Sequence, residues 1–150
     1  MPANNLHVIE LLNDLIATSH DSEEGFGKAA KGVHSDELRD MFTEISKQRA
    51  AFAAELEEQV RRLGGKPDTA GHYGAILHPG WGDLEARIRP KDDLAFLAEC
   101  RRGEESSLKH FGHALARDLP PDIRAVVEEQ ANRLRMTIER LRGDERTRAA

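Results

Sequence analysis

The stretch SDELRDMFTEISKQRAAFAAELEEQVRRLGG, residues 35–65, decides the fold class of this chain. Its apolar residues recur three or four positions apart, so that on a helix they form one continuous stripe. Ser35 is a favourable N-cap residue, and the acidic Asp36 and Glu37 suit the positive end of the helix dipole. Gly64 and Gly65 end the pattern. We therefore predict one long amphipathic helix, with a stripe made of Leu38, Met41, Phe42, Ile45, Phe52, Leu56, Val60 and Leu63.

Three further segments show the same helical spacing of apolar residues. They run from about Asn5 to Gly32, from about Asp92 to Asp118, and from just after Pro120-Pro121 to just before Gly143. Asn4 or Asn5 is a candidate N-cap for the first of them. None of the segments alternates apolar and polar residues with the period of a β-strand. The sequence therefore predicts an all-α protein.

The lengths of the connections predict how these helices are arranged. The first and third connections are short and favour antiparallel hairpins, whereas residues 64–91 are long enough to travel the length of a bundle. Two hairpins joined by a long crossover form a four-helix bundle with ferritin-like connectivity. We expect one domain over residues 1–150, with a polar tail at residues 143–150 that frays.

The crossover is rich in apolar residues, and we expect it to be ordered against the bundle. A short helix is expected near Asp83 to Arg89. The apolar residues of the crossover are Tyr73, Ile76, Leu77, Trp81, Leu84 and Ile88.

Composition excludes several classes of protein. The chain has 150 residues, with 22 lysines and arginines against 27 aspartates and glutamates, and a formal charge of -5. This charge speaks against a nucleic-acid binder, because neutralising phosphates requires a basic face. The single Cys100 excludes an internal disulfide, and Glu10 and Asp14 interrupt the apolar run near the N-terminus, unlike a signal peptide or a membrane span. We expect a cytoplasmic protein that binds neither nucleic acid nor membranes.

Short sequence pieces spread along nearly the whole chain resemble a bacterial family of small ferritin-like four-helix-bundle proteins, mostly from Proteobacteria, known as a domain of unknown function. The resemblance implies a fold and a superfamily, and it implies no particular activity. The pieces that carry it are Glu23-Glu24-Gly25-Phe26, Gln48-Arg49, Phe52, Glu55-Leu56, Gly64-Gly65-Lys66-Pro67, Leu77-His78, Trp81, Leu84, Glu99-Cys100, Gly103-Glu104 and Leu119-Pro120.

A polar layer is predicted at mid-bundle, where ferritin-like proteins hold a di-iron site. Such sites use one inward Glu from each of two helices and a Glu-x-x-His motif from each of the other two. Both expected histidines are missing, because Ala51 stands three residues after Gln48 and Arg133 stands three residues after Gln130. Gln48 lies beside Arg49 and competes with it for the inward position. Projection of each helix on its apolar stripe places in this layer Glu23, Gln48, Arg49, Arg101, Glu104 and Gln130.

Two interpretations of this layer are open. In the favoured one, Arg49 and Arg101 compensate the carboxylates of Glu23 and Glu104 in a metal-free network, and the protein acts without catalysis or cofactor in a structural or stress-associated interaction role. In the alternative, Glu23, Glu104 and Gln130 hold iron or manganese in a metal-binding or di-iron oxidase-type protein. A pocket for an apolar ligand is least favoured, since large apolar residues fill the stripes.

Other residues suggest weaker hypotheses. Gly25 and Gly103 lie inside helices and off their apolar stripes, where glycine lowers helix stability, so that a homodimer contact or a local helix bulge is expected there. His110 and His113 have the spacing of a transition-metal pair, but a solvated face is the favoured interpretation. Cys100 lies beside two arginines and is interpreted as a small, partly buried apolar residue.

Overall fold

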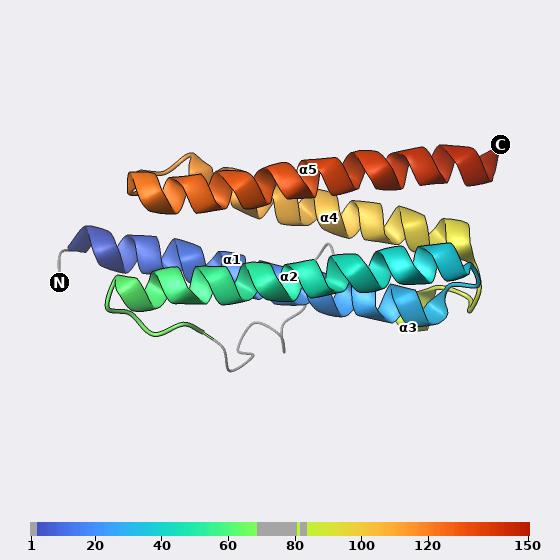
Figure 1. Cartoon of the computed structure of the whole chain (residues 1–150), viewed down its shortest axis with the longest axis horizontal. Coiled ribbons are helices and arrows are strands. Elements are labelled where there is room, and N and C mark those ends of the chain that lie inside the picture. Colours follow the sequence, from blue (N-terminus) through green and yellow to red (C-terminus); the bar gives the residue numbers. More distant parts are fainter. Residues whose placement is uncertain (1–2, 69–80, 82–83) are drawn as a thin grey trace.

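The protein is all-helical over the residues that its computed structural model describes, which are residues 3–68, 81 and 84–150. Within these described residues, five helices follow one another (Figure 1). They are α1 (Ala3–Gly32), α2 (Asp36–Arg62), α3 (Leu84–Arg87), α4 (Asp93–Leu115) and α5 (Pro121–Ala149).

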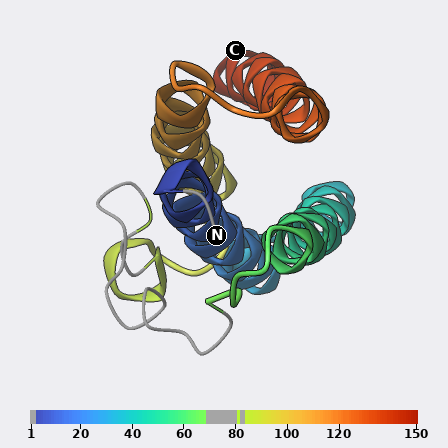
Figure 2. The same cartoon turned by 90° about the vertical axis from the view of Figure 1, so that its left-hand side faces the viewer.

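The four long helices form two antiparallel hairpins, α1 with α2 and α4 with α5, as the sequence predicts. The hairpins pack on each other mainly through α1 and α4, while α2 and α5 make few contacts with each other. Figure 2 shows this arrangement along the bundle axis, with α5 and α2 as the two outer arms. The all-α four-helix bundle is confirmed.

Local capping chemistry defines where the helices begin and end. The side chain of Ser35 accepts a hydrogen bond from the backbone N–H of Leu38 at 3.2 Å, as expected for an N-cap. At the other end of α2, Gly64 adopts a positive φ of 83°, and its N–H donates to the carbonyl of Arg61 at 2.9 Å. The expected cap at Asn4 or Asn5 is wrong, because α1 already begins at Ala3 and contains both residues.

The buried apolar side chains form two clusters, one toward each end of the bundle. The first cluster includes Leu12 and Phe111, and the second includes Phe26 and Phe96. Each of the four long helices contributes residues to both clusters, so both hairpins span them. Several buried polar side chains lie between the clusters, among them Arg49, Glu104 and Thr137.

The structure differs from the expected frayed tail at residues 143–150, because α5 continues through Ala149. Side chains from distant segments hold this last part of the helix. The guanidinium of Arg101 donates to Glu145 at 2.7 Å, and that of Arg148 donates to Ser35 at 3.1 Å. The tail is polar, but its charged side chains pair with residues that are distant in the sequence, so that helical spacing within the tail does not reveal them.

The described part of the crossover packs on the bundle. Trp81, Leu84 and Ile88 are buried in the second apolar cluster, and α3 falls within the short helix expected near residues 83–89. Tyr73, Ile76 and Leu77 lie outside the described residues. Among the helices that are described, none is long and apolar enough to span a membrane.

Candidate functional site

A buried ion pair joins the two hairpins between the apolar clusters. Arg49 of α2 and Glu104 of α4 meet there, with only 1% and 0% of their side chains exposed. Their Nη1–Oε1 and Nη2–Oε2 distances are 2.7 and 2.5 Å. The same Nη2 donates a hydrogen bond to the hydroxyl of Thr137 on α5 at 3.0 Å. Nη1 donates a charge-assisted hydrogen bond to Oε1, whereas Nη2 and Oε2 are in ionic contact only, so that Oε2 of Glu104 and Nε of Arg49 have no hydrogen-bond partner among the described residues.

The surroundings of the pair compensate its burial. The guanidinium carbon of Arg49 lies 5.8 Å from the ring centre of Phe26 and 5.3 Å from that of Phe52, within the range of cation–π contacts. Burial raises the pKa of Glu104 above that of an ordinary glutamate, while the charge and hydrogen bond of Arg49 oppose this shift. Each charge therefore depends on the other to remain in the interior.

Two residues expected in the polar layer lie elsewhere. The side chain of Glu23 is 38% exposed and lies 3.0 Å from Nδ1 of His20 at the surface. Arg101 pairs with Glu145 and with Glu105, at 2.7 and 3.0 Å. Their expected inward position is wrong, because both occupy the edge of their helix stripe, where a long side chain turns toward solvent and finds a charged neighbour.

The two glutamines also stay outside the ion pair. Gln130 is buried, and its Nε2 donates to the backbone carbonyl of Phe52 at 3.3 Å and to Glu55 at 2.9 Å. Its Oε1 has no hydrogen-bond partner. Gln48 is half-buried beside the space between α2 and α5. The structure thus brings together Arg49 and Glu104 from the expected set, and it adds Thr137.

The position of Thr137 in this layer could have been predicted from the sequence, although the projection of the helices did not single it out. It follows Gln130 by two helical turns on the same face of α5, and a threonine that faces an apolar core needs a hydrogen-bond partner. Its hydroxyl donates to the carbonyl of Arg133 at 3.0 Å and accepts from Arg49.

The residues of this layer do not fit an iron or manganese site. Of the three alternative ligands, Glu104 is occupied by Arg49, Glu23 is at the surface, and Gln130 contacts Glu55. Within the described part of the chain, no group of three or more His, Cys, Asp or Glu residues is placed to hold a metal ion. A guanidinium aimed at the buried carboxylate also repels a cation.

Trp81 explains the two unusual glycines. A Cβ atom on Gly25 would lie 2.1 Å from the indole ring of Trp81, and one on Gly103 would lie 2.4 Å from it. The indole Nε1 donates to the hydroxyl of Ser107 at 3.0 Å, which in turn lies 3.1 Å from the hydroxyl of Ser22. The expected dimer contact or helix bulge at these glycines is wrong, because the tryptophan of the crossover fills that space.

Cys100 is fully buried, one helical turn before Glu104. Burial, followed by the negative charges of Glu104 and Glu99, raises the pKa of its thiol well above the ordinary value. Arg101 and Arg102 do not activate it, because they pair with Glu145 and Glu99. The thiol is therefore an unreactive part of the core.

His110 and His113 differ in their surroundings. His113 is exposed, whereas Nδ1 of His110 lies 2.9 Å from a carboxylate oxygen of Asp14 on α1. The hydrogen bond and charge of Asp14 raise the pKa of His110 above that of an ordinary histidine, and partial burial opposes this shift. The pair links the first helices of the two hairpins in a pH-dependent way.

We expect the protein to lose stability as the pH rises through the raised pKa of His110. Protonated His110 stabilises the fold fully below the pKa of the unfolded state, about pH 6.5, and less as the proton leaves. Urea unfolding at several pH values between acid and mildly alkaline conditions measures this dependence. In Asp14→Asn the slope should flatten, whereas in His113→Gln it should match the wild type; equal slopes in all three proteins would contradict the assignment.

Solved structures share this fold. A point mutant of Dps1 from Mycobacterium smegmatis matches with a TM-score of 0.84 at 15% sequence identity, over 97% of this chain and 99% of that one. A two-domain protein from Anabaena variabilis with DJ-1/ThiJ/PfpI-like and ferritin-like domains matches with a TM-score of 0.77 at 19% identity, over 97% of this chain and 37% of that one. At such identities the likeness shows the fold alone. Comparison with curated proteins gave no match.

The sequence also matches a family model, over residues 7–117. This span contains the α1–α2 hairpin, the crossover and α4, and hence both residues of the buried ion pair. The family is described as a domain of unknown function, DUF2383. The chain belongs to the DUF2383 family, and its fold is the ferritin-like four-helix bundle.

Proposed function

We propose that this protein is a non-catalytic ferritin-like bundle that acts as a structural or stress-associated interaction protein, with an arginine in place of the metal. The observation that carries the proposal is the buried ion pair between Arg49 and Glu104. A metal centre needs buried carboxylates that are free to bind a cation. In this bundle the guanidinium takes that role and neutralises Glu104 without a cofactor.

The remaining features of the proposal concern where and with what the protein works. We propose a cytoplasmic, bacterial protein that forms a homodimer and also contacts a protein partner. The surface supports contact with proteins more than with nucleic acid, because acidic residues outnumber basic ones and the formal charge is -5. With the crossover filling the space at Gly25 and Gly103, a dimer contact has to use another face.

The proposal predicts that the protein neither retains nor responds to iron or manganese. Protein purified without a tag is analysed by elemental mass spectrometry, and its melting temperature is then measured anaerobically with and without ferrous iron or Mn²⁺. We expect substoichiometric metal and an unchanged melting temperature, because a ligand that binds only the folded state would raise it.

A matched pair of variants makes the result decisive. Stoichiometric metal that raises the melting temperature, disappears in Glu104→Ala and persists in Glu105→Ala would refute the proposal. The enzyme interpretation, an oxidase-type metal protein, would then replace it.

A further inference from the structure

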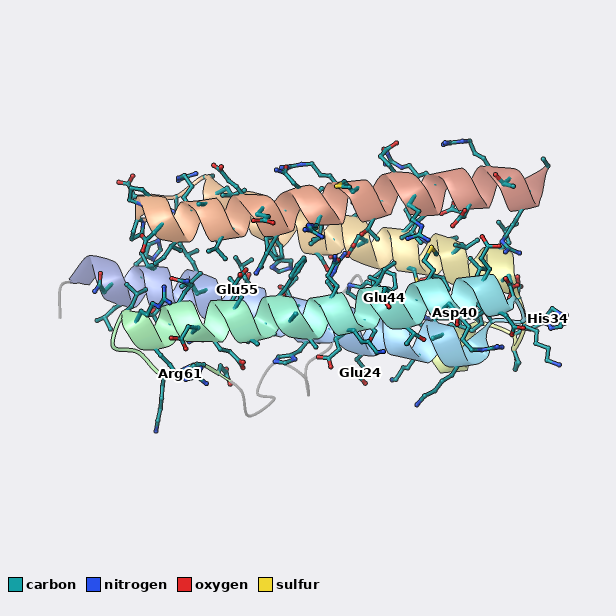
Figure 3. All side chains as sticks on the ribbon, in the orientation of Figure 1. Glu24, His34, Asp40, Glu44, Glu55 and Arg61 are labelled. Atoms are coloured by element: carbon teal, nitrogen blue, oxygen red, sulfur yellow. The ribbon has the colours of Figure 1, made fainter. Side chains whose placement is uncertain are left out.

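A groove runs between α2 and α5, which make few contacts with each other. Its main hollow measures about 560 Å³, and a second hollow of about 210 Å³ continues it. Both hollows share Gln48 and Arg133, so they form one continuous groove from Glu44 to Glu55. Figure 3 shows these two glutamates on the side of α2 that faces α5. At 1.5 Å per residue the groove is about 16 Å long, which is three turns of an α-helix.

The groove offers apolar surface to solvent. Met136 lines the main hollow, where Ile45 is nearly buried at 7% exposure, and the half-buried Phe52 lines the second hollow. Met136 is 69% exposed, which makes it the most exposed large apolar side chain in the described part of the chain. Methionine is flexible and polarisable, and it is over-represented on surfaces that bind helices. A partner that covers Met136 would gain apolar burial without a rearrangement of the bundle.

The main hollow is positively charged, in contrast to the protein as a whole, whereas the second hollow carries Glu55 and Glu129 beside Arg133. Lys47, Arg133 and Arg140 line its main hollow against the single carboxylate of Glu44. No ion pair connects Lys47 or Arg140 to any described residue, and Arg133 reaches only Glu129, at 3.7 Å. The chain carries a formal charge of -5. Two unpaired cations beside an apolar strip therefore form a surface complementary to carboxylates.

The second hollow contains a buried acceptor. Gln130 lines it and is 1% exposed, and its Oε1 has no hydrogen-bond partner. A buried acceptor without a partner is costly, and a donor supplied by an occupant of the groove would remove that cost. Apolar, cationic and acceptor groups thus follow one another along a single groove.

We propose that the α2–α5 groove binds one amphipathic acidic helix of a partner protein, with its apolar face on Met136 and Phe52 and its carboxylates toward Lys47 and Arg140. This inference rests on the proposed interaction role and names its surface. Nucleic acid fits less well, because a phosphate backbone would leave the exposed side chain of Met136 uncovered and would run past the main hollow onto Glu55 and Glu129. A helix can instead place its carboxylates at Lys47 and Arg140 alone.

The test uses the full chain and a displayed library of alanine-based helical peptides, each about three to five turns long and randomised on one face. Peptides sorted for binding to the wild type are sequenced. Their affinities are then measured by fluorescence anisotropy against Met136→Asp, Arg140→Glu and the control Arg135→Glu. Arg135 is exposed on α5 and pairs with Asn132 outside the groove. Melting curves verify that all variants fold. We expect them to fold, because Arg135, Met136 and Arg140 are exposed.

We expect enriched peptides with apolar residues three and four positions apart and acidic residues beside them. They should lose at least about tenfold in affinity against both groove variants and keep it against Arg135→Glu. Basic peptides, peptides indifferent to the groove variants, or no binders at all would overturn the proposal.

Two other occupants give distinct results. A dimer in light scattering that Met136→Asp dissociates would assign the groove to a second copy, and a DNA duplex whose binding needs Arg140 would assign it to nucleic acid; either result overturns the proposal. These variants leave Arg49 and Glu104 intact, so a failure of peptide binding would count against the groove proposal alone. Metal uptake would refute the metal-free assignment of the ion pair and would not bear on the groove.

Discussion

Replacing Arg49 by methionine is expected to lower the free energy of unfolding by about 3–5 kcal/mol. The substitution preserves most of the side-chain volume but leaves Glu104, which is 0% exposed, without its counter-charge. Because burial already raises the pKa of Glu104, the unpaired carboxyl can take up a proton in the folded state, so the loss should be smaller at acid than at alkaline pH. Urea unfolding at about pH 5 and about pH 8 measures both effects.

Two further variants separate the charge from the packing. The double variant Arg49→Met/Glu104→Leu should regain most of the lost stability, since a buried ion pair and a well-packed apolar pair are often equivalent in free energy. Arg101→Met should lose less, about 1 kcal/mol, because its ion pairs with Glu145 and Glu105 stay partly open to solvent, which screens them. If Arg49→Met proved as mild as Arg101→Met, the ion pair would not be the organising contact of the layer.

Replacing Trp81 by alanine is expected to lower the free energy of unfolding by about 3–5 kcal/mol. The indole is 3% exposed, stacks edge-on against Phe26 at 5.1 Å between ring centres, and donates to Ser107. Its removal leaves a cavity on the α1–α4 face and takes one hydrogen-bond donor from Ser107, whose hydroxyl keeps only Ser22 as a partner among the described residues. Chemical unfolding followed by circular dichroism measures the loss, because the variant lacks the only tryptophan of the chain.

The glycine opposite the ring supplies the control. Gly103→Ala should destabilise the wild type by about 1–3 kcal/mol, because its Cβ would lie 2.4 Å from the indole. In the Trp81→Ala background the same substitution should stabilise the protein, by up to about 1 kcal/mol, through better helix propensity. An unchanged sign between the two backgrounds would contradict the proposed contact.

The helices and their pairing could be predicted because they depend on local patterns. The apolar stripe of residues 35–65, the Ser35 cap and the two short connections were sufficient for two antiparallel hairpins, and the length of residues 64–91 was sufficient for the crossover. Arg49 and Glu104 could be found because both lie near the centre of their stripes. At the stripe edges, however, a helix projection does not decide which way a long side chain turns, and there Glu23 and Arg101 were misplaced.

Contacts between distant segments account for the other differences. The glycines at positions 25 and 103 showed that something approaches the helices closely, but glycine does not specify what approaches. The helical end of α5 depends on Asp93, Glu145 and Arg148, which meet only in the folded bundle. Such pairings become visible only when the packing of the hairpins is known.

The position of the ion pair between two apolar clusters has a consequence for how the hairpins dock during folding. Sliding α2 along α4 by one helical turn, about 5.4 Å, would move Arg49 or Glu104 into an apolar cluster and separate their charges. Two apolar surfaces can pack in several alignments that differ by a helical turn. With one buried charge on each hairpin, every alignment that separates the two charges is unfavourable. We expect the two hairpins to associate in a single alignment, with misaligned encounter complexes dissociating before they can become trapped.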